Sequence, residues 1–295
     1  MPNILDNIKR TFNKGDVLMK FIFINIAMFL AINAIGVIIT LFRLESLDLI
    51  TYLAVPSQLN KLLIRFWTFF TYMFVHVGFM HILFNMLWLY WFGKIFLTYF
   101  NERTLGSLYV IGGLAGALLY ILAFNTIPYY IEFKYPPLIG ASASVMAIVM
   151  AAAFYRPEAT LNLLLLGRVK IIYIAIAVFF IDFFSLSSGS NPGGHVAHIG
   201  GAVAGYLFAS QYRKGKDITL PISRFLDKIA NLFKKRKHKG AHKVVYKKPE
   251  SDYDYNYRKA QESKNIDGIL DKLKQSGYGS LTSDEKRQLF DASKK

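Results

Sequence analysis

The sequence predicts an all-α fold, a polytopic membrane bundle of six transmembrane helices followed by a mostly cytoplasmic tail. Of the 295 residues, 54% are hydrophobic, and the mean hydropathy is +0.32. Mostly apolar runs recur between residues 20 and 212, several of them near the length of about 18 residues that a spanning helix needs. A few polar and ionisable residues interrupt these runs. Because such groups are costly at membrane depth, they are candidates for function.

The apolar runs predict spans at residues 20–42, 81–100, 105–124, 142–155, 171–186 and 196–212. The fourth run is short, which is tolerated where a helix begins inside protein or a water-filled cavity. The first run exceeds the apolar core of a signal peptide and has no small-residue cleavage site after it. We therefore expect it to remain as a helix.

The sequence divides into four parts by composition. Residues 1–19 form a short basic cytoplasmic arm, and residues 20–212 form the transmembrane domain. Residues 213–264 are a basic and tyrosine-rich cytoplasmic linker, and within them 218–233 could form an amphipathic helix. Residues 265–295 are expected to form a small helical segment, since a capping-box pattern begins at Thr282.

Basic residues in the short loops set the expected orientation. They flank the loop after the second span (Lys94, Arg103) and the loop after the fourth (Arg168, Lys170). With six spans, both termini then lie in the cytoplasm and the polar sites lie toward the outer face. The expected location is an integral multi-pass position, most simply in a bacterial inner membrane.

The formal net charge of +16 arises mainly in the tail, where residues 213–295 hold 22 of the 35 Lys and Arg residues. No nucleic-acid-binding module accompanies this charge, so no nucleic-acid partner is expected. Anionic membrane lipids are the simpler partner for a basic run beside a membrane. The chain has no cysteine, which excludes disulfides and a thiol nucleophile.

The first candidate residue is Ser142, which follows Gly140-Ala141 where a loop turns into the fourth span. A serine hydroxyl is a weak nucleophile and needs a nearby base and donors for an oxyanion. Unpaired N–H groups at a helix start could supply such donors. A plain helix-cap serine is the alternative. Ser144 is a rival nucleophile, but it lies about 200° further round the helix, so both cannot face one base.

The second candidate is His198, near the start of the sixth span. Gly201 and Gly205 follow it at helical spacing, and Ala143, Ala147 and Ala151 form a comparable stripe on the fourth span. Small residues let membrane helices approach closely. We therefore expect the fourth and sixth spans to pack together through Gly201 and Gly205, which would bring His198 near Ser142. A purely structural contact remains the alternative.

The third candidate is the pair His81 and Asn85, which share a helix face at positions i and i+4. Both side chains can donate hydrogen bonds to an oxyanion, although an interhelical hydrogen bond is the simpler role. A metal site is not expected. The histidines before the tail form two small clusters without a His-Glu-x-x-His motif, and Asp182 is the only acid well inside a span near the outer side. No cofactor is expected either.

These pieces together resemble the rhomboid family of intramembrane serine proteases. The matching residues are His76, His81 and Asn85 on the second span, Gly140-Ala141-Ser142 at the fourth, and His198, Gly201 and Gly205 on the sixth. The resemblance implies a six-helix core and a Ser142–His198 dyad without an acid. It implies an oxyanion site formed by His81, Asn85 and the Ser142 N–H, and transmembrane proteins as substrates that enter near spans two and five.

The sequence departs from the family pattern at two places. Ala143 follows the serine where glycine is common, and Thr68 follows Trp67 where arginine is common. The first departure concerns a tight helix contact, and the second concerns the anchoring of the first outer loop.

Two other functions remain as alternatives. A catalytically inactive rhomboid-like protein would bind membrane helices without cleaving them, and a transporter would use the polar cluster as a relay. Retention of both Ser142 and His198 favours the protease. The broken-helix repeats of a transporter are not visible in the sequence.

Overall fold

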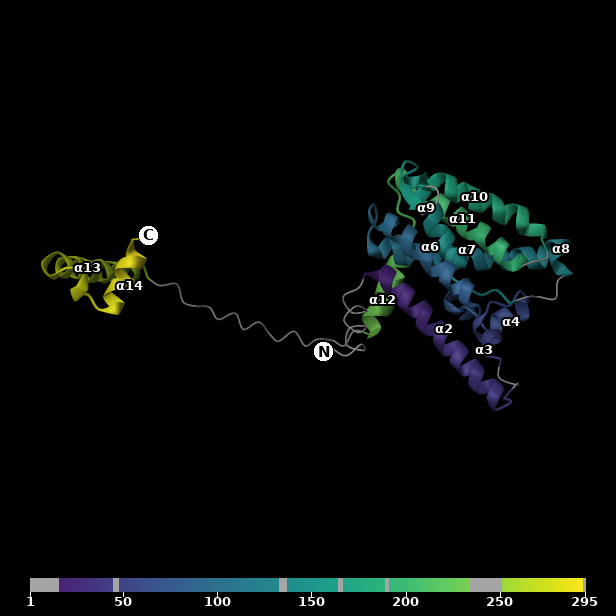
Figure 1. Ribbon diagram of the computed structural model, residues 1–295, viewed down its shortest axis with the longest axis horizontal. Helices are drawn as coiled ribbons and strands as arrows, with labels where there is room; N and C mark the ends of the chain where they lie inside the picture. Colours follow the sequence, from purple (N-terminus) through teal and green to yellow (C-terminus); the bar gives the residue numbers. More distant parts are fainter. Residues whose placement is uncertain are drawn as a thin grey trace. The chain divides into compact units, whose positions relative to one another are not determined.

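The computed structural model describes residues 16–44, 48–132, 137–163, 167–188, 191–233 and 251–293. The chain forms two compact units, residues 1–235 and 236–295, and each is described by itself (Figure 1). Predictions for the N-terminal arm before Asp16 and for the basic run at 234–248 lie outside the described residues.

The first unit is a helical bundle with one small hairpin. Its longer helices are α2 (Val17–Leu41), α6 (Phe79–Leu97), α7 (Glu102–Thr126), α9 (Ser142–Tyr155), α10 (Ile171–Phe184), α11 (Pro192–Arg213) and α12 (Leu220–Phe233). Its short elements are α3 (Leu49–Leu53), α4 (Leu59–Ile64), α5 (Thr68–Thr71), η1 (Tyr72–Phe74), α8 (Pro128–Ile131) and η2 (Ser185–Ser187).

Helices α2, α6, α7, α9, α10 and α11 correspond to the six predicted spans, so the predicted all-α membrane bundle is confirmed. Among the described residues, α2, α6 and α7 are long and apolar enough to cross a membrane, and α9 and α10 are shorter apolar helices. Helix α11 starts at Pro192 and not at residue 196. The reason is that the Asn191 side chain accepts from the Gly194 N–H, and proline suits the first helical position.

Helix α9 lies at the centre of the bundle and packs on α6, α7, α10 and α11 (Figure 1). Every residue from Ala143 to Ala153 is buried. A helix surrounded by protein on all sides needs no polar face and no full membrane length. This explains how a helix of only 14 residues can be the buried central helix of the bundle.

The long segment between α2 and α6 is fixed by hydrogen bonds from its own side chains. Arg65 Nη1 donates to the Thr51 carbonyl at 2.9 Å, and the Trp67 indole donates to the Tyr52 carbonyl at 2.9 Å. The buried Thr68 hydroxyl donates to the Arg65 carbonyl at 2.7 Å. Thr68 stands where the family pattern has arginine, and its hydroxyl bonds to the backbone of this segment. The guanidinium of Arg65, three positions earlier in the chain, bonds to the segment as well.

A two-stranded hairpin, absent from the sequence prediction, connects α9 to α10. Strands β1 (Thr160–Leu163) and β2 (Gly167–Lys170) pair antiparallel, with Thr160 opposite Lys170. Strands of only four residues are too short to give a clear periodic signal in the sequence.

The second unit contains α13 (Asp252–Ser276), η3 (Tyr278–Ser280) and α14 (Ser283–Ala292). Helix α13 begins thirteen residues before the predicted start at 265, so the boundary between the linker and the C-terminal segment was placed too late. Ser251 caps the helix by accepting from the Asp254 N–H, and the Tyr253 and Tyr257 rings stack one turn apart. A mostly polar first half hides this helix from hydropathy analysis.

Lowering the pH should loosen the start of α14. The Glu285 carboxylate accepts from the Thr282 N–H and from Lys272, and these contacts hold the pKa of Glu285 below its ordinary value of 4.5. A lowered folded-state pKa stabilises the structure above pH 4.5 and loses that effect as pH falls through the folded-state value. We expect amide-exchange protection of α14 in the full chain to fall in this window. A Glu285→Gln variant should show a smaller pH dependence; an equal dependence would contradict the assignment.

Candidate functional site

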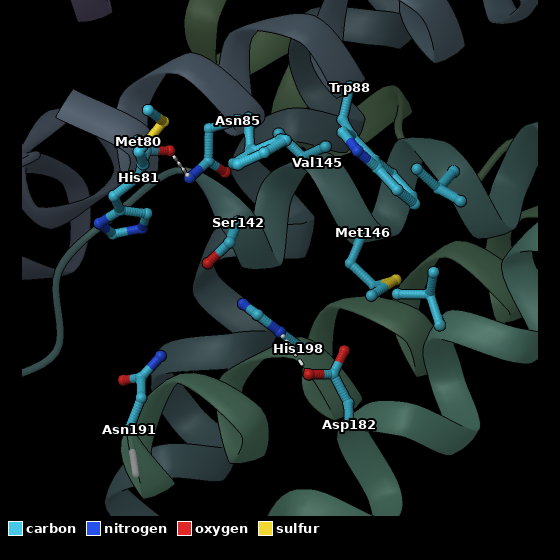
Figure 2. Close-up of a pocket in the computed structure, with 13 residues that line it drawn as sticks. Met80, His81, Asn85, Trp88, Ser142, Val145, Met146, Asp182, Asn191 and His198 are labelled. Carbon is cyan, nitrogen blue, oxygen red and sulfur yellow. Dashed lines mark hydrogen bonds and ion pairs between the residues drawn. The ribbon is translucent and has the colours of Figure 1, made fainter. Parts of the chain in front are cut away.

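The predicted site residues meet at one cavity of about 380 Å³ (Figure 2). Its polar lining comes from α6, α9, α10 and α11 and from the residue before α11: His81, Asn85, Ser142, Asp182, Asn191 and His198. Its apolar lining comes from α6, α9 and α10: Met80, Phe84, Trp88, Val145, Met146, Val149 and Val178. The structure therefore brings together four residues predicted from separate parts of the sequence.

The loop before Ser142 is held by backbone hydrogen bonds to the segment before α6. Leu138 and Val55 exchange both backbone hydrogen bonds, at 3.0 and 3.1 Å. The Gly140 N–H donates to the Tyr72 carbonyl at 2.9 Å, and the Ala141 N–H donates to His76 Nε2 at 3.4 Å. Four contacts within four residues fix the entry into α9, so the position of Ser142 depends on the segment between α2 and α6.

Gly140 is required at the turn for two reasons. Its φ is +111°, a conformation that residues with a side chain rarely adopt. A Cβ there would also lie 2.8 Å from two atoms of the His81 ring. The glycine thus lets the His81 imidazole lie directly against the turn that presents Ser142.

Ser142 is the first residue of α9, and that helix has no side-chain cap. The first N–H groups of a helix have no intrahelical acceptor, and they lie at the positive end of the helix dipole. The Ser142 hydroxyl and these N–H groups therefore come from the same turn, as an oxyanion site requires.

Close packing against α7 and α11 sets the position of α9. A Cβ on Gly201 would lie 2.1 Å from the Ala143 carbonyl oxygen, and one on Gly205 would lie 2.2 Å from the Ala147 carbonyl oxygen. The two glycines therefore bring α11 against the backbone of α9, as the sequence predicted for this helix pair.

The extra methyl group of Ala143 points to a different helix. A Cβ built on Gly116 of α7 would lie 2.5 Å from the Ala143 Cβ, and one on Gly112 would lie 2.4 Å from the Ala147 Cβ. The glycines of α7 thus make room for the alanine side chains of α9. The departure from the family pattern at Ala143 is accommodated at Gly116 and does not separate α9 from α11.

His198 of α11 faces Ser142 across the cavity (Figure 2). Among the hydrogen bonds of the described residues, none joins the Ser142 and His198 side chains, and such contacts are often long in structures without a ligand. The Nδ1 atom of His198 lies 2.8 Å from Asp182 Oδ1, so the other ring nitrogen is the one available on the cavity side.

Asn85 and His81 form the opposite wall on α6. The Asn85 amide donates to the His81 carbonyl one turn earlier, at 2.8 Å. The His81 ring lies edge-on to the ring of the buried His76, with 5.0 Å between centroids. His76 therefore supports both the Ser142 loop and the His81 imidazole.

Ser144, the rival nucleophile, and His195, which comes three residues before His198, occupy other positions. Ser144 is buried, faces away from the cavity, and its hydroxyl has no hydrogen-bond partner among the described residues. His195 contacts Asp182 through Nδ1 at 2.8 Å and does not line the cavity.

Sequence reasoning missed the role of Asp182 in this site. The resemblance implied a serine and a histidine without an acid, yet Asp182 of α10 contacts His198 and lines the cavity. The available signal was the presence of an ionisable residue inside a span, which marks a functional candidate by itself. Asn191, which also lines the cavity, gave no signal beyond its place in a Gly/Ser-rich loop.

Comparison with known proteins adds three findings. The Rhomboid domain family matches residues 64–214. DUF6576, a family of unknown function, matches residues 250–295, which cover the described helices of the second unit. The chain is similar to the RHOMBOID-like protein 12, mitochondrial, of Arabidopsis thaliana, with 30% identity over 161 residues. The match covers 52% of this chain and 48% of that relative, so the chain spans about half the length of the curated relative it matches.

Proposed function

Because the chain belongs to the rhomboid family, we propose that it is an intramembrane serine endopeptidase that cleaves transmembrane proteins. The observation that carries the proposal is that Ser142, His198, His81 and Asn85, from three different helices, line one cavity. The residues supply a nucleophile, a base and oxyanion donors in a single space.

The proposed reaction follows the residues around the cavity. Ser142 Oγ attacks the substrate carbonyl carbon while its proton passes to His198 Nε2. The oxyanion is held by the Ser142 N–H together with His81 and Asn85. The C–N bond then breaks as His198 gives its proton to the departing amine, leaving an ester on Ser142. Water attacks the ester through His198, which releases the carboxylate product and restores the Ser142 hydroxyl.

The helices that line the cavity support entry of a substrate from the surrounding lipid. Helices α6 and α10 both pack on α9 and both line the cavity, and α10 has only three buried residues. Its paired aromatic residues Phe179, Phe180, Phe183 and Phe184 are half-buried or exposed along the helix. We propose that a substrate helix reaches Ser142 from the lipid between α6 and α10.

The proposed topology places both termini in the cytoplasm and the cavity toward the outer face. Lys94 and Arg103, which flank the α6–α7 connection, and the basic residues of the α9–α10 hairpin support this orientation. Membrane lipids are the proposed partners of the basic tail. The location in a bacterial inner membrane remains a prediction from the sequence.

Active-site labelling tests the proposal. We expect a fluorophosphonate to label the purified full-length protein at Ser142 and at no other serine, because among the described serines Ser142 is the one that lines the cavity with His198. Ser144→Ala is the matched control, since it removes a neighbouring hydroxyl outside the cavity, and labelling should persist. Absence of labelling in a folded sample that also leaves a transmembrane reporter uncut would instead favour a non-cleaving helix-binding protein.

A further inference from the structure

We propose that Asp182 is a positioning residue that fixes the orientation and tautomer of His198, so that the site is a Ser142–His198–Asp182 triad. This inference rests on the proposed serine endopeptidase function. It differs from the arrangement implied by the family resemblance, in which the serine and histidine act without an acid.

Asp182 Oδ1 lies 2.8 Å from Nδ1 of both His198 and His195, and the residue is 5% exposed. A single carboxylate oxygen thus joins α10 to two histidines one turn apart on α11. The other oxygen, Oδ2, is buried and has no hydrogen-bond partner in the part of the chain described. Among the described residues, the hydrogen bonds of this carboxylate therefore all go to histidines.

The contact with Asp182 also determines which ring nitrogen of His198 carries the proton. An ionised carboxylate only accepts hydrogen bonds, so each histidine must donate from Nδ1. In a neutral imidazole with hydrogen on Nδ1, the lone pair is on Nε2. Figure 2 shows one ring nitrogen of His198 bound to Asp182 and the other directed toward Ser142. The carboxylate thus selects the tautomer that can take the Ser142 proton.

Asp182 also lies where it can stabilise the positive charge that His198 acquires in the proposed reaction. When His198 takes the serine proton it becomes an imidazolium in an apolar cavity, and burying an unpaired charge is costly. A carboxylate at Nδ1 stabilises that imidazolium, as in soluble serine proteases. An acid inside a membrane helix is itself costly, and pairing with His198 and His195 gives it a physical reason to be there.

A metal ion is the competing interpretation, because Asp182, His195 and His198 could each offer one ligand atom. The distances favour hydrogen bonds. Zinc ligands at about 2.0–2.1 Å in tetrahedral geometry lie roughly 3.3 Å from each other. The two N···O separations here are 2.8 Å, which matches a charge-assisted hydrogen bond.

The test compares Asp182→Asn and Asp182→Glu with the parent in a kinetic assay on a transmembrane reporter, using the full chain in lipid vesicles. We expect Asp182→Asn to lower kcat by about 10²-fold or more with little change in KM, because general base catalysis contributes roughly 10²–10⁴-fold. Asp182→Glu, which keeps the carboxylate but displaces it, should retain more activity than Asp182→Asn. Glu158→Gln, which removes an exposed carboxylate from the hairpin connection, should match the parent.

A second measurement separates positioning from a merely structural link between α10 and α11. Nitrogen-15 spectra of labelled histidines should show His198 with its proton on Nδ1 in the parent and with a mixed tautomer in Asp182→Asn. Parent His198 lacking the Nδ1 proton would overturn the inference, even if the Asp182 variants fail to fold. Lower thermal stability in Asp182→Asn with parental kcat would overturn it as well.

The same assay distinguishes failure of this inference from failure of the proposed function. If Ser142→Ala is inactive while Asp182→Asn keeps the parental kcat, only the role of Asp182 is wrong. If Ser142→Ala cleaves like the parent, the proposed function itself is wrong. Activity that is lost on chelation and restored by zinc would overturn the positioning role in favour of a metal site.

Discussion

Replacing Ser142 and His198 with alanine, singly and together, is expected to lower kcat by about the same factor, on the order of 10³-fold or more. The two side chains face each other at one cavity, and the proposed mechanism gives both of them a part in the same proton transfer. Once either is lost, the other has no function to perform, so the second substitution should have little further effect. The measurement is single-turnover cleavage of a transmembrane reporter in vesicles.

Ser144→Ala is the control for this series, because it removes a buried hydroxyl that has no hydrogen-bond partner among the described residues. Its kcat should stay near the parental value. If the two single substitutions had small effects that multiplied in the double variant, Ser142 and His198 would act independently and the proposed mechanism would be incorrect.

Replacing Gly201 with valine is expected to have the largest effect on stability. A Cβ at this position would lie 2.1 Å from the Ala143 carbonyl oxygen and 2.8 Å from its carbonyl carbon. These are backbone atoms of a buried central helix, so α9 and α11 must separate. Overpacking of this kind costs about 1–3 kcal/mol and occasionally more, and we expect the upper end of that range because no flexible side chain can yield.

Gly36→Val is the matched control for Gly201→Val, since Gly36 is also in a membrane-length helix and nothing lies within 4 Å of its added Cβ. In thermal unfolding in detergent, the midpoint should fall clearly for Gly201→Val and should not fall for Gly36→Val, because valine favours a helix more than glycine does. Equal midpoints for both variants would show that the contact between α9 and α11 is not tight in solution.

Much of this site could be predicted from residues alone because polar groups in apolar helices are easily recognised. Ser142, His198, His81 and Asn85 stood out for that reason, and all four line the cavity. The spacing of Gly201 and Gly205 indicated which helix would approach α9 closely. Their chemical roles stay predictions until activity is measured.

The contact between Asp182 and His198 could not be predicted in the same way. The two residues are on different helices, α10 and α11, with η2 between them, so no helical periodicity relates them. Their meeting depends on how α10 is rotated against α11, which the sequence pattern does not determine. The direction of the Ala143 methyl group was hidden for the same reason, because only packing shows that it faces Gly116.

The second unit shows a different limit of sequence reasoning. The capping box at Thr282 and Glu285 was visible in the sequence and is present in the structure. The start of α13 was missed because its first three turns are polar and tyrosine-rich and lack a continuous apolar face. The Ser251 cap and the stacked Tyr253 and Tyr257 rings are present there instead.

The most direct test of the central claim is to detect the ester on Ser142. A transmembrane reporter is mixed with the full-length protein in vesicles, the reaction is stopped in acid within one turnover, and the Ser142 peptide is analysed by mass spectrometry. We expect a Ser142 peptide that carries the amino-terminal fragment of the reporter, and no such peptide from Ser142→Ala. If the protein cleaved the reporter and no Ser142 ester formed at any time in the reaction, the proposed mechanism would be contradicted.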